Sequence, residues 1–102
     1  MPSLEQLHRL LEADPGDPFT LYALAQEHAK QGDHARAIAF YDRCLAANPD
    51  ECYAYFHKAR SQEALDDEPA AIATLDAGIA VATRLNDAKA LGELSSYRDE
   101  LA

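Results

Sequence analysis

The sequence predicts an all-α protein of antiparallel helix-turn-helix repeats, with about six helices in one domain. Residues 32–46 and 66–80 align at an offset of 34 residues, with identities at Asp33 and Asp67, Ala37 and Ala71, Ile38 and Ile72, Ala39 and Ala73, Asp42 and Asp76, and Ala46 and Ala80. A fixed period of this length is typical of a supersecondary unit that is copied and stacked, because one copy cannot bury its apolar face alone. The composition agrees, since 21 alanines favour helix and the chain has no β-rich run.

The period extends beyond these two segments. Residues 11–15 align with residues 45–49, so the chain opens in the middle of a repeat, and the pairs Phe19 and Tyr53, Tyr22 and Phe56, and Ala25 and Ala59 continue the match. We therefore expect a half repeat over residues 3–17, a full repeat over 18–51, a second over 52–85 and a C-terminal capping helix over 86–102. At 102 residues these parts form one domain, residues 1–102.

Local signals delimit the first three helices. Ser3 followed by Gln6 is a capping box, which predicts a helix over about 3–13 that ends before Pro15. Asp17 and Pro18 introduce a second helix over about 18–31, which stops at Gly32. A third runs from residue 33 or 34 to 47, because the following Asn-Pro pair at 48–49 cannot continue a helix.

The remaining three helices follow the same logic. We expect a helix over about 51–65, an acidic turn over 66–68 whose carboxylates favour the positive start of the next helix, and that helix from near Pro69 to about Leu85. Asn86 and Asp87 then cap a last helix over 88–101, which Gly92 weakens by about 1 kcal/mol relative to alanine. Such short loops make successive helices antiparallel neighbours.

The charge excludes two classes of partner. The formal net charge is −9, from 18 acidic and nine basic residues, and the basic residues are scattered along the sequence. Nucleic acid and anionic membrane surfaces both require clustered positive charge, so neither is an expected partner. Ten aspartates against three lysines fit either a salt-rich cytoplasm or an ordinary acidic surface, and melting curves at low and multimolar salt separate the two.

The sequence also favours a cytoplasmic location. Its first residues lack the basic start and apolar core of a secretory signal, and no apolar run approaches the length that crosses a bilayer. The two cysteines, Cys44 and Cys52, have no framework spacing, which is typical of a reduced compartment.

No motif predicts a cofactor, a metal site or catalysis. The four histidines (His8, His28, His34 and His57) form no pair at helical ligand spacing, and seven residues separate the two cysteines without a CxxC unit. The acidic turn at 66–68 lacks the spacing and glycine of a calcium loop, so a solvated helix entry is the simpler interpretation. Without a glycine-rich phosphate loop or a nucleophile elbow, we expect no enzyme.

A 34-residue helix-turn-helix unit that ends in proline resembles the tetratricopeptide repeat. That family needs small residues where its two helices touch, and matching positions hold Ala25, Ala37 and Cys44 in the first copy and Ala59, Ala71 and Gly78 in the second. The Gly32-Asp33 turn, Tyr41 and Pro49 also match. The chain departs from the pattern at Leu21, His28, Tyr55, Lys58, Gln62 and Thr83, so the second copy is the looser match. The resemblance implies a short right-handed α-solenoid.

The resemblance also implies a binding surface, because the first helices of such repeats line the concave side of the array. Applied to this chain, it predicts partner-binding residues Phe19, Tyr22, Gln26, Tyr53, Phe56 and Arg60. Aromatic and arginine side chains favour a protein or peptide partner, and the acidic balance favours an apolar or basic segment over an acidic tail. The alternative is that some rings, above all Phe19 and Tyr53, are ordinary packing residues.

Self-association is the competing functional hypothesis. The opening helix carries a leucine stripe, formed by Leu4, Leu7, Leu10 and Leu11, that would be exposed at the end of a stack. A homodimer would cover it, or the leucines pack on the first full repeat. Light scattering at several concentrations distinguishes a dimer from a monomer.

Overall fold

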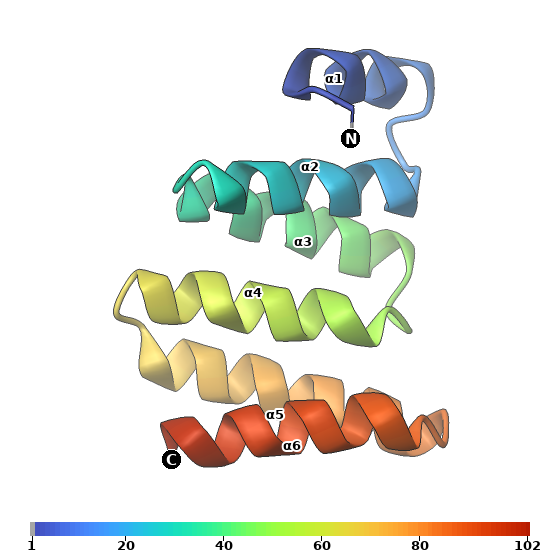
Figure 1. The fold of residues 1–102 in the computed structure, drawn as a ribbon. Coiled ribbons are helices and arrows are strands. Elements are labelled where there is room, and N and C mark those ends of the chain that lie inside the picture. Colours follow the sequence, from blue (N-terminus) through green and yellow to red (C-terminus); the bar gives the residue numbers. More distant parts are fainter. Residues whose placement is uncertain (1) are drawn as a thin grey trace.

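The computed structural model describes residues 2–102, and within this range it consists of six α-helices without a strand (Figure 1). Their bounds are α1 Leu4–Ala13, α2 Pro18–Lys30, α3 His34–Ala47, α4 Cys52–Ala64, α5 Glu68–Arg84 and α6 Ala88–Leu101. Met1, the first residue of the expected domain, lies outside the described residues. The all-α prediction is confirmed, and each helix begins and ends within about one residue of its predicted bounds.

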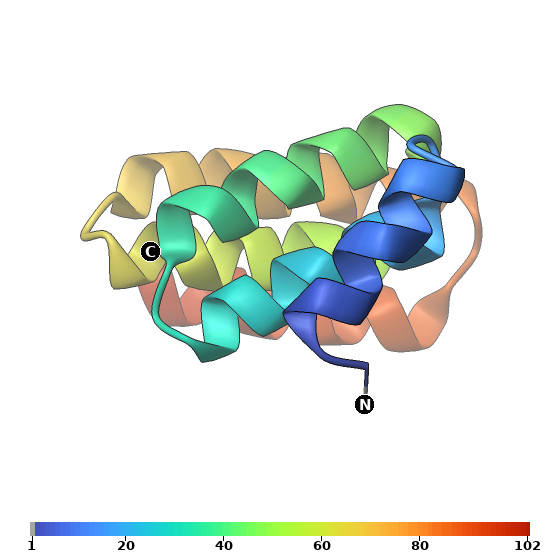
Figure 2. The same ribbon diagram turned by 90° about the horizontal axis from the view of Figure 1, so that it is seen from above.

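The helices form two layers. In Figure 1, α2, α4 and α6 lie in front of α3 and α5, and Figure 2 shows the same two layers from above. Successive helices are antiparallel, and the tightest packing joins α2 with α3, α4 with α5, and α5 with α6. Helix α1 packs against α2 at one end of the stack, and α6 closes the other end. Consequently α2, α4 and α6 share one face of the molecule.

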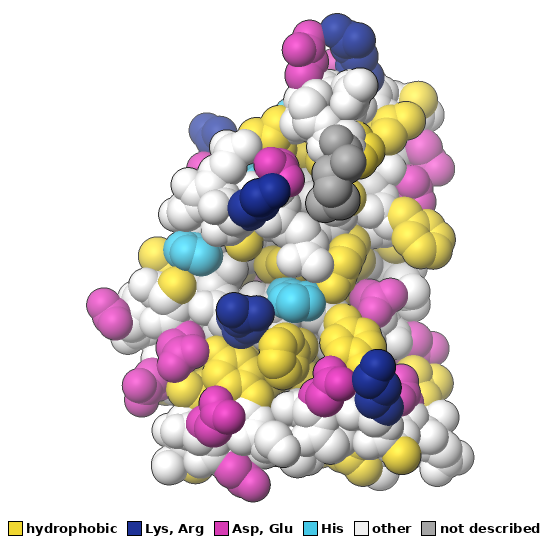
Figure 3. Space-filling view, in the orientation of Figure 1, with side chains coloured by type: hydrophobic (Ala, Val, Ile, Leu, Met, Phe, Trp, Pro, Cys, Tyr) yellow, Lys and Arg dark blue, Asp and Glu magenta, His cyan; other side chains and the backbone are white. Residues whose placement is uncertain are grey.

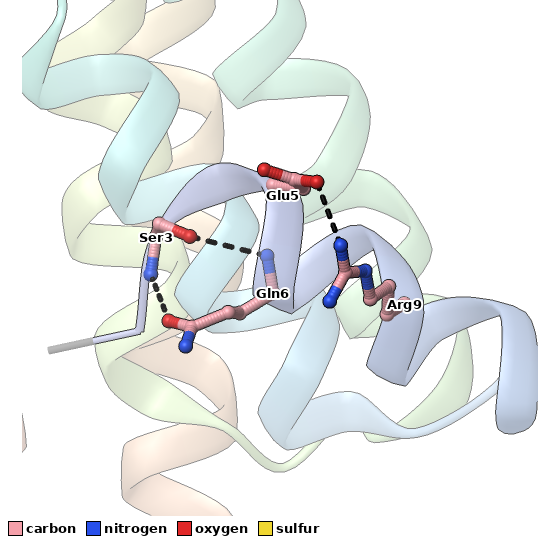
Figure 4. Close-up of polar contacts among 4 residues, drawn as sticks. All are labelled: Ser3, Glu5, Gln6 and Arg9. Atoms are coloured by element: carbon pink, nitrogen blue, oxygen red, sulfur yellow. Dashed lines mark hydrogen bonds and ion pairs between the residues drawn. The ribbon is translucent and has the colours of Figure 1, made fainter.

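The start of α1 is the capping box that the sequence predicts (Figure 4). The backbone N–H of Ser3 donates to Gln6 Oε1 at 2.8 Å, and the N–H of Gln6 donates to Ser3 Oγ at 3.2 Å. One turn on, Arg9 forms an ion pair with Glu5 at 2.7 Å. The two hydrogen bonds between Ser3 and Gln6 satisfy backbone N–H donors that would otherwise have no partner at the start of the helix.

Three turns between helices use the same backbone geometry. Gly32, Asp66 and Asn86 adopt positive φ angles of 85°, 61° and 56°. In each turn the next residue is an aspartate whose N–H bonds back to the preceding helix at 2.9 Å and whose carboxylate accepts an N–H of the next helix. A left-handed residue followed by such a bond is a Schellman end, which closes one helix as the aspartate opens another.

This geometry corrects two details of the sequence analysis. Asp66 does not stabilise the start of α5 but ends α4 in the left-handed conformation, and the capping carboxylate is that of Asp67. Likewise Asn86 ends α5, so Asp87 alone caps α6. Helix α5 runs past Thr83, where the first copy has its proline, because the closing turn comes later in the chain.

Small residues allow the helix pairs to approach closely. All six small positions named above are buried: Ala25, Ala37, Cys44, Ala59, Ala71 and Gly78. At Gly78 a Cβ atom would lie 2.7 Å from Tyr55 Cβ and 3.3 Å from Leu94 Cδ2, so no larger residue fits without movement of a helix. Cys44 and Cys52 are free thiols buried in the core, as expected for packing residues.

The leucines of α1 were expected either to pack on the first full repeat or to be covered by a second copy, and they differ in burial. Leu7 is buried, and Leu11 packs against the core cluster that contains Leu21 and Tyr41. Leu10 remains 52% exposed. The packing interpretation therefore holds for Leu7 and Leu11, while Leu10 leaves an apolar side chain on the surface. No helix in the described part of the chain is both long and apolar enough to span a membrane.

Candidate partner-binding surface

The shared face of α2, α4 and α6 has three hollows between its helices, and a further hollow of about 440 Å³ lies along α2 alone. Figure 3 shows this face, on which hydrophobic side chains gather between α4 and α6 and acidic side chains lie beside them. The first hollow, about 250 Å³, lies between the starts of α2 and α4. The second, about 450 Å³, lies between the ends of α2 and α4, and the third, about 740 Å³, lies between α4 and α6.

Three aromatic rings line the first hollow. Its lining includes Phe19, Tyr22, Tyr53 and Cys44. Phe19 is 83% exposed, whereas Tyr22 is half-buried and packs edge-on against Tyr41 at 6.0 Å between ring centroids. Burial raises the pKa of Tyr22 to about 12, and burial together with the Glu51 charge raises the pKa of the Cys44 thiol to about 11. The thiol therefore stays protonated and is not a nucleophile at neutral pH.

The second hollow is lined by basic, acidic and uncharged polar groups. Lys30, Arg60, His57 and Glu63 border it, and the hydroxyl of Tyr41 in its lining donates to Gln26 Oε1 at 3.3 Å. Burial, reinforced by the nearby Arg60 charge, lowers the pKa of His57, which favours the neutral ring. The His57 ring lies edge-on to Tyr22 and Phe56 and so connects the aromatic residues of α2 and α4.

The third hollow combines an aromatic wall with charged side chains. The rings of Phe56 and Tyr97 are 5.2 Å apart, and the Tyr97 hydroxyl donates to Glu63 Oε1 at 2.6 Å. Burial and this hydrogen bond raise the pKa of Tyr97, so it remains a neutral donor to the Glu63 carboxylate. The other lining residues are Arg60, Ala88, Lys89, Gly92, Glu93, Ser96 and Glu100.

All six residues predicted from the sequence line these hollows. Phe19, Tyr22 and Tyr53 line the first, Gln26 the second, and Phe56 the third, while Arg60 lies between the second and third. For Phe19 the exposed fraction excludes a packing role, whereas Tyr53 and Phe56 also pack against the core cluster of α4, α5 and α6.

The sequence analysis missed the contribution of α6. It treated residues 86–102 only as a capping helix, whereas the exposed polar residues Lys89, Glu93 and Ser96 of α6 line the third hollow opposite α4. The signal lay in the period, since Tyr97 follows Glu63 by one 34-residue repeat.

A pair of histidines lies outside this surface. The His28 ring stacks on Phe40 at 5.4 Å, and His8 approaches both rings at 6.2 Å, so the fold brings together two histidines that sequence spacing did not pair. Nε2 of His28 is buried without a hydrogen-bond partner in the described part of the chain, and burial lowers the pKa of this ring. Within residues 2–102, no group of three or more His, Cys, Asp and Glu side chains is placed to hold a metal ion.

Comparison with known proteins identifies the family. The model of a protein family described as anaphase-promoting complex, cyclosome, subunit 3 matches residues 5–78. Two solved structures of a tetratricopeptide repeat domain protein from Salinibacter ruber are also similar. The solution NMR structure is 40% identical, with 86% of this chain and 89% of that chain covered and a TM-score of 0.79. The crystal structure is 39% identical, with 83% and 94% covered and a TM-score of 0.76.

A third solved structure extends the likeness of fold. The TPR2B domain of yeast Sti1, in a complex with pHsp70, is 22% identical and has a TM-score of 0.88, with 96% of this chain and 78% of that chain covered. Among curated proteins no significant match is found. The family match, the similar repeat structures and the helix pairs described above agree with one another. The chain therefore belongs to the tetratricopeptide repeat family, in the group that the subunit 3 model describes.

Proposed function

We propose that this protein is a non-catalytic interaction module that binds a segment of a protein partner across the hollows of α2, α4 and α6. The tetratricopeptide repeat is in general a module for protein–protein interaction, and the Sti1 domain that shares the fold was solved in a complex with pHsp70. The net charge of −9 favours an apolar or basic segment, because charge complementarity steers association and suppresses acidic partners.

The exposure of Phe19 carries this proposal. A phenylalanine that is 83% exposed contributes little to folding, and it lies at the edge of a hollow of about 250 Å³ whose other rings are Tyr22 and Tyr53. Aromatic side chains that become buried on binding dominate interface energies. The first hollow has the size and apolar lining to receive one apolar side chain of a partner.

Selection from a library of random 12-residue peptides on the immobilised protein tests the proposal. The tightest peptide is then titrated by calorimetry against the wild type, Phe19→Ala and the control Leu65→Ala. We expect Phe19→Ala to weaken binding about tenfold and to leave the melting temperature unchanged, because the ring has almost no contacts to lose in the free protein. Leu65 is 51% exposed and lines none of the three hollows, so the Leu65→Ala variant should bind the peptide as tightly as the wild type does.

Tyr22→Ala and Phe56→Ala extend the test. Both should also weaken the peptide, but these rings contact Tyr41 and Tyr97, so stability must be measured alongside affinity. If the library yields no binder, or if Phe19→Ala binds as tightly as the wild type, the assignment of this surface is wrong.

Homo-oligomerisation through the terminal helices is the alternative. Leu10 is 52% exposed and borders a shallow hollow of about 380 Å³ on α1, together with Pro2, Gln6 and Arg9. If this surface joins two copies, light scattering shows a dimer whose dissociation is promoted by Leu10→Glu. A monomer at all concentrations removes the alternative without affecting the first proposal.

A further inference from the structure

We propose that the third hollow, between α4 and α6, receives a lysine or arginine side chain of the bound segment. The inference rests on the proposed function and specifies the chemistry of its occupant. The cationic group would lie at one end of the hollow between Glu63 and Glu100, and its aliphatic stem would lie along the aromatic wall.

The third hollow is lined by three carboxylates, of which two, those of Glu63 and Glu100, lie at one end, while Glu93 lies one turn after Lys89 toward the other end. Glu63 is the next-to-last residue of α4 and Glu100 the next-to-last residue of α6, and the two helices run parallel, so both carboxylates lie at the same end (Figure 1). Lys89 lies in the first turn of α6, at the opposite end. Arg60 lies one turn before Glu63, and both of these residues also border the second hollow. We call the end formed by Glu63, Tyr97 and Glu100 the acidic end.

The backbone adds to this polarity. A helix carries a partial negative charge at its C-terminus, and α4 and α6 both end beside the acidic end. Arg98, the basic residue in the last turn of α6, pairs instead with Asp76 of α5. Two carboxylates and two helix C-termini therefore face one end of the hollow, which favours a cation there.

Both carboxylates are free of ion pairs, and that of Glu63 is held in place by a hydrogen bond. The ion pairs of residues 2–102 join Arg9 with Glu5, Arg36 with Asp33, Lys58 with Asp42, Arg84 with Asp50, and Arg98 with Asp76. Neither Glu63 nor Glu100 takes part in one. The Tyr97 hydroxyl orients Glu63 through one of its oxygens, and a carboxylate has further lone pairs that can accept hydrogen bonds from an ammonium or guanidinium group.

The aromatic wall suits the rest of such a side chain. Lysine and arginine bury their stems along apolar surface while their charged groups remain hydrated or paired, and a cation near a ring face gains electrostatic attraction. Phe56 and Tyr97 provide two rings 5.2 Å apart within the same hollow as the carboxylates.

Gly92 supplies the space. It lies in the interior of α6, where glycine disfavours helix, yet a Cβ at this position would meet no atom within 4 Å. Gly78 differs, because its neighbours leave no room for a side chain. Packing thus explains Gly78 but not Gly92, and a side chain at position 92 would project into the third hollow, which this residue lines.

Binding measurements on the selected 12-residue peptides test the inference. We expect the peptides to be enriched in lysine or arginine beside an apolar residue. Replacing that basic residue with norleucine, which retains an aliphatic stem without charge, should weaken binding about five- to tenfold. Glu63→Gln with Glu100→Gln should weaken the original peptide by a similar factor and leave the norleucine peptide unaffected, which is the coupling expected of a direct contact. Asp99→Asn is the matched control, since it removes one charge from the neighbouring position, which lines no hollow.

Substitution at Gly92 tests the shape of the site independently of charge. Gly92→Leu should fill the hollow and weaken the basic peptide at least tenfold, with the melting temperature unchanged or raised by a few degrees because glycine is removed from a helix. Ala77→Leu is the control, because it places the same side chain at an exposed position of α5, a helix that lines none of the three hollows.

The outcomes separate this inference from the proposed function. If peptides bind and Phe19→Ala weakens them, but norleucine replaces the basic residue without loss, the surface binds partners and the inference about its third hollow is wrong. Enrichment of acidic residues, with loss of binding in Arg60→Gln, also overturns it. If no peptide binds, the proposed function itself fails.

Discussion

Glycine to alanine substitutions at positions 78 and 92 should have opposite effects on stability. Both glycines lie within helices, Gly78 in α5 and Gly92 in α6, so alanine gains about 0.5–1 kcal/mol of helix propensity at either position. The difference lies in the surroundings of the added methyl group. At position 92 it meets no atom within 4 Å, whereas at position 78 it would lie 2.7 Å from Tyr55 Cβ and 3.1 Å from Tyr55 Cγ.

The clash at position 78 cannot be relieved by rotation of a flexible side chain. Tyr55 Cβ is fixed by the backbone of α4, and the Tyr55 hydroxyl donates to the carbonyl of Pro49 at 3.0 Å, which holds the ring. Relief requires α4 and α5 to separate, and overpacking of this kind costs about 1–3 kcal/mol. Gly78→Ala should therefore lower the free energy of unfolding by about 1–2 kcal/mol, while Gly92→Ala should raise it by about 0.5–1 kcal/mol.

Urea and thermal unfolding, followed by far-ultraviolet circular dichroism, measure this contrast. For a domain of this size the two variants should differ in melting temperature by roughly 10 °C. The wild type and an exposed α5 variant, Ala77→Ser, serve as references. Equal stability of the two variants would refute the reasoning, because it would mean that α4 and α5 are not in close contact at Gly78.

Three further predictions concern the core, a hydrogen bond and a histidine. Leu75→Ala, at a fully buried position, should lower the free energy of unfolding by about 3 kcal/mol, against less than about 1 kcal/mol for the partly exposed Leu85→Ala, both measured in urea. Tyr97→Phe removes the hydrogen bond to the exposed carboxylate of Glu63 and should cost about 1 kcal/mol in the same assay. Burial lowers the pKa of His28 below its usual 6.5, so the unfolded chain binds this proton more readily; stability should fall as pH decreases below about 6.5, and His28→Gln should weaken that dependence.

Most helix boundaries were predictable because they depend on nearby residues. Ser3 with Gln6, Asp17 and Asp87 determine helix starts through contacts within four positions, and the structure contains each of these caps. The roles of Asp66 and Asn86 were harder to predict. Aspartate and asparagine at these positions suggest capping of the next helix, whereas in the structure both residues end the preceding helix in the left-handed conformation. The alignment offers the missing signal, since Asp66 occupies the position of Gly32 one repeat later.

The candidate surface was predictable in part for a related reason. The period placed Phe19, Tyr22, Tyr53 and Phe56 on the first helices of the two copies, and the structure gives these helices one shared face. Residues of α6 were missed because few of them match the residues of α4 to which the 34-residue offset relates them, and the position of α6 opposite α4 follows from tertiary packing. The repeat limits, the cytoplasmic location and the binding roles of the six residues stay predictions.

Contacts between residues one repeat apart determine how the number of repeats in this protein could change. Tyr97 donates a hydrogen bond to Glu63, and Arg84 forms an ion pair with Asp50, each across 34 residues. Within the described residues, the helices that pack together are at most two positions apart in the order α1 to α6. An additional copy of residues 18–51 inserted at the loop before Cys52 would therefore separate only α2 and α3 from α4, and the copy would offer the same residues on both sides of the insertion. It would lengthen the array in one discrete step and enlarge the stretch of partner chain that can be accommodated.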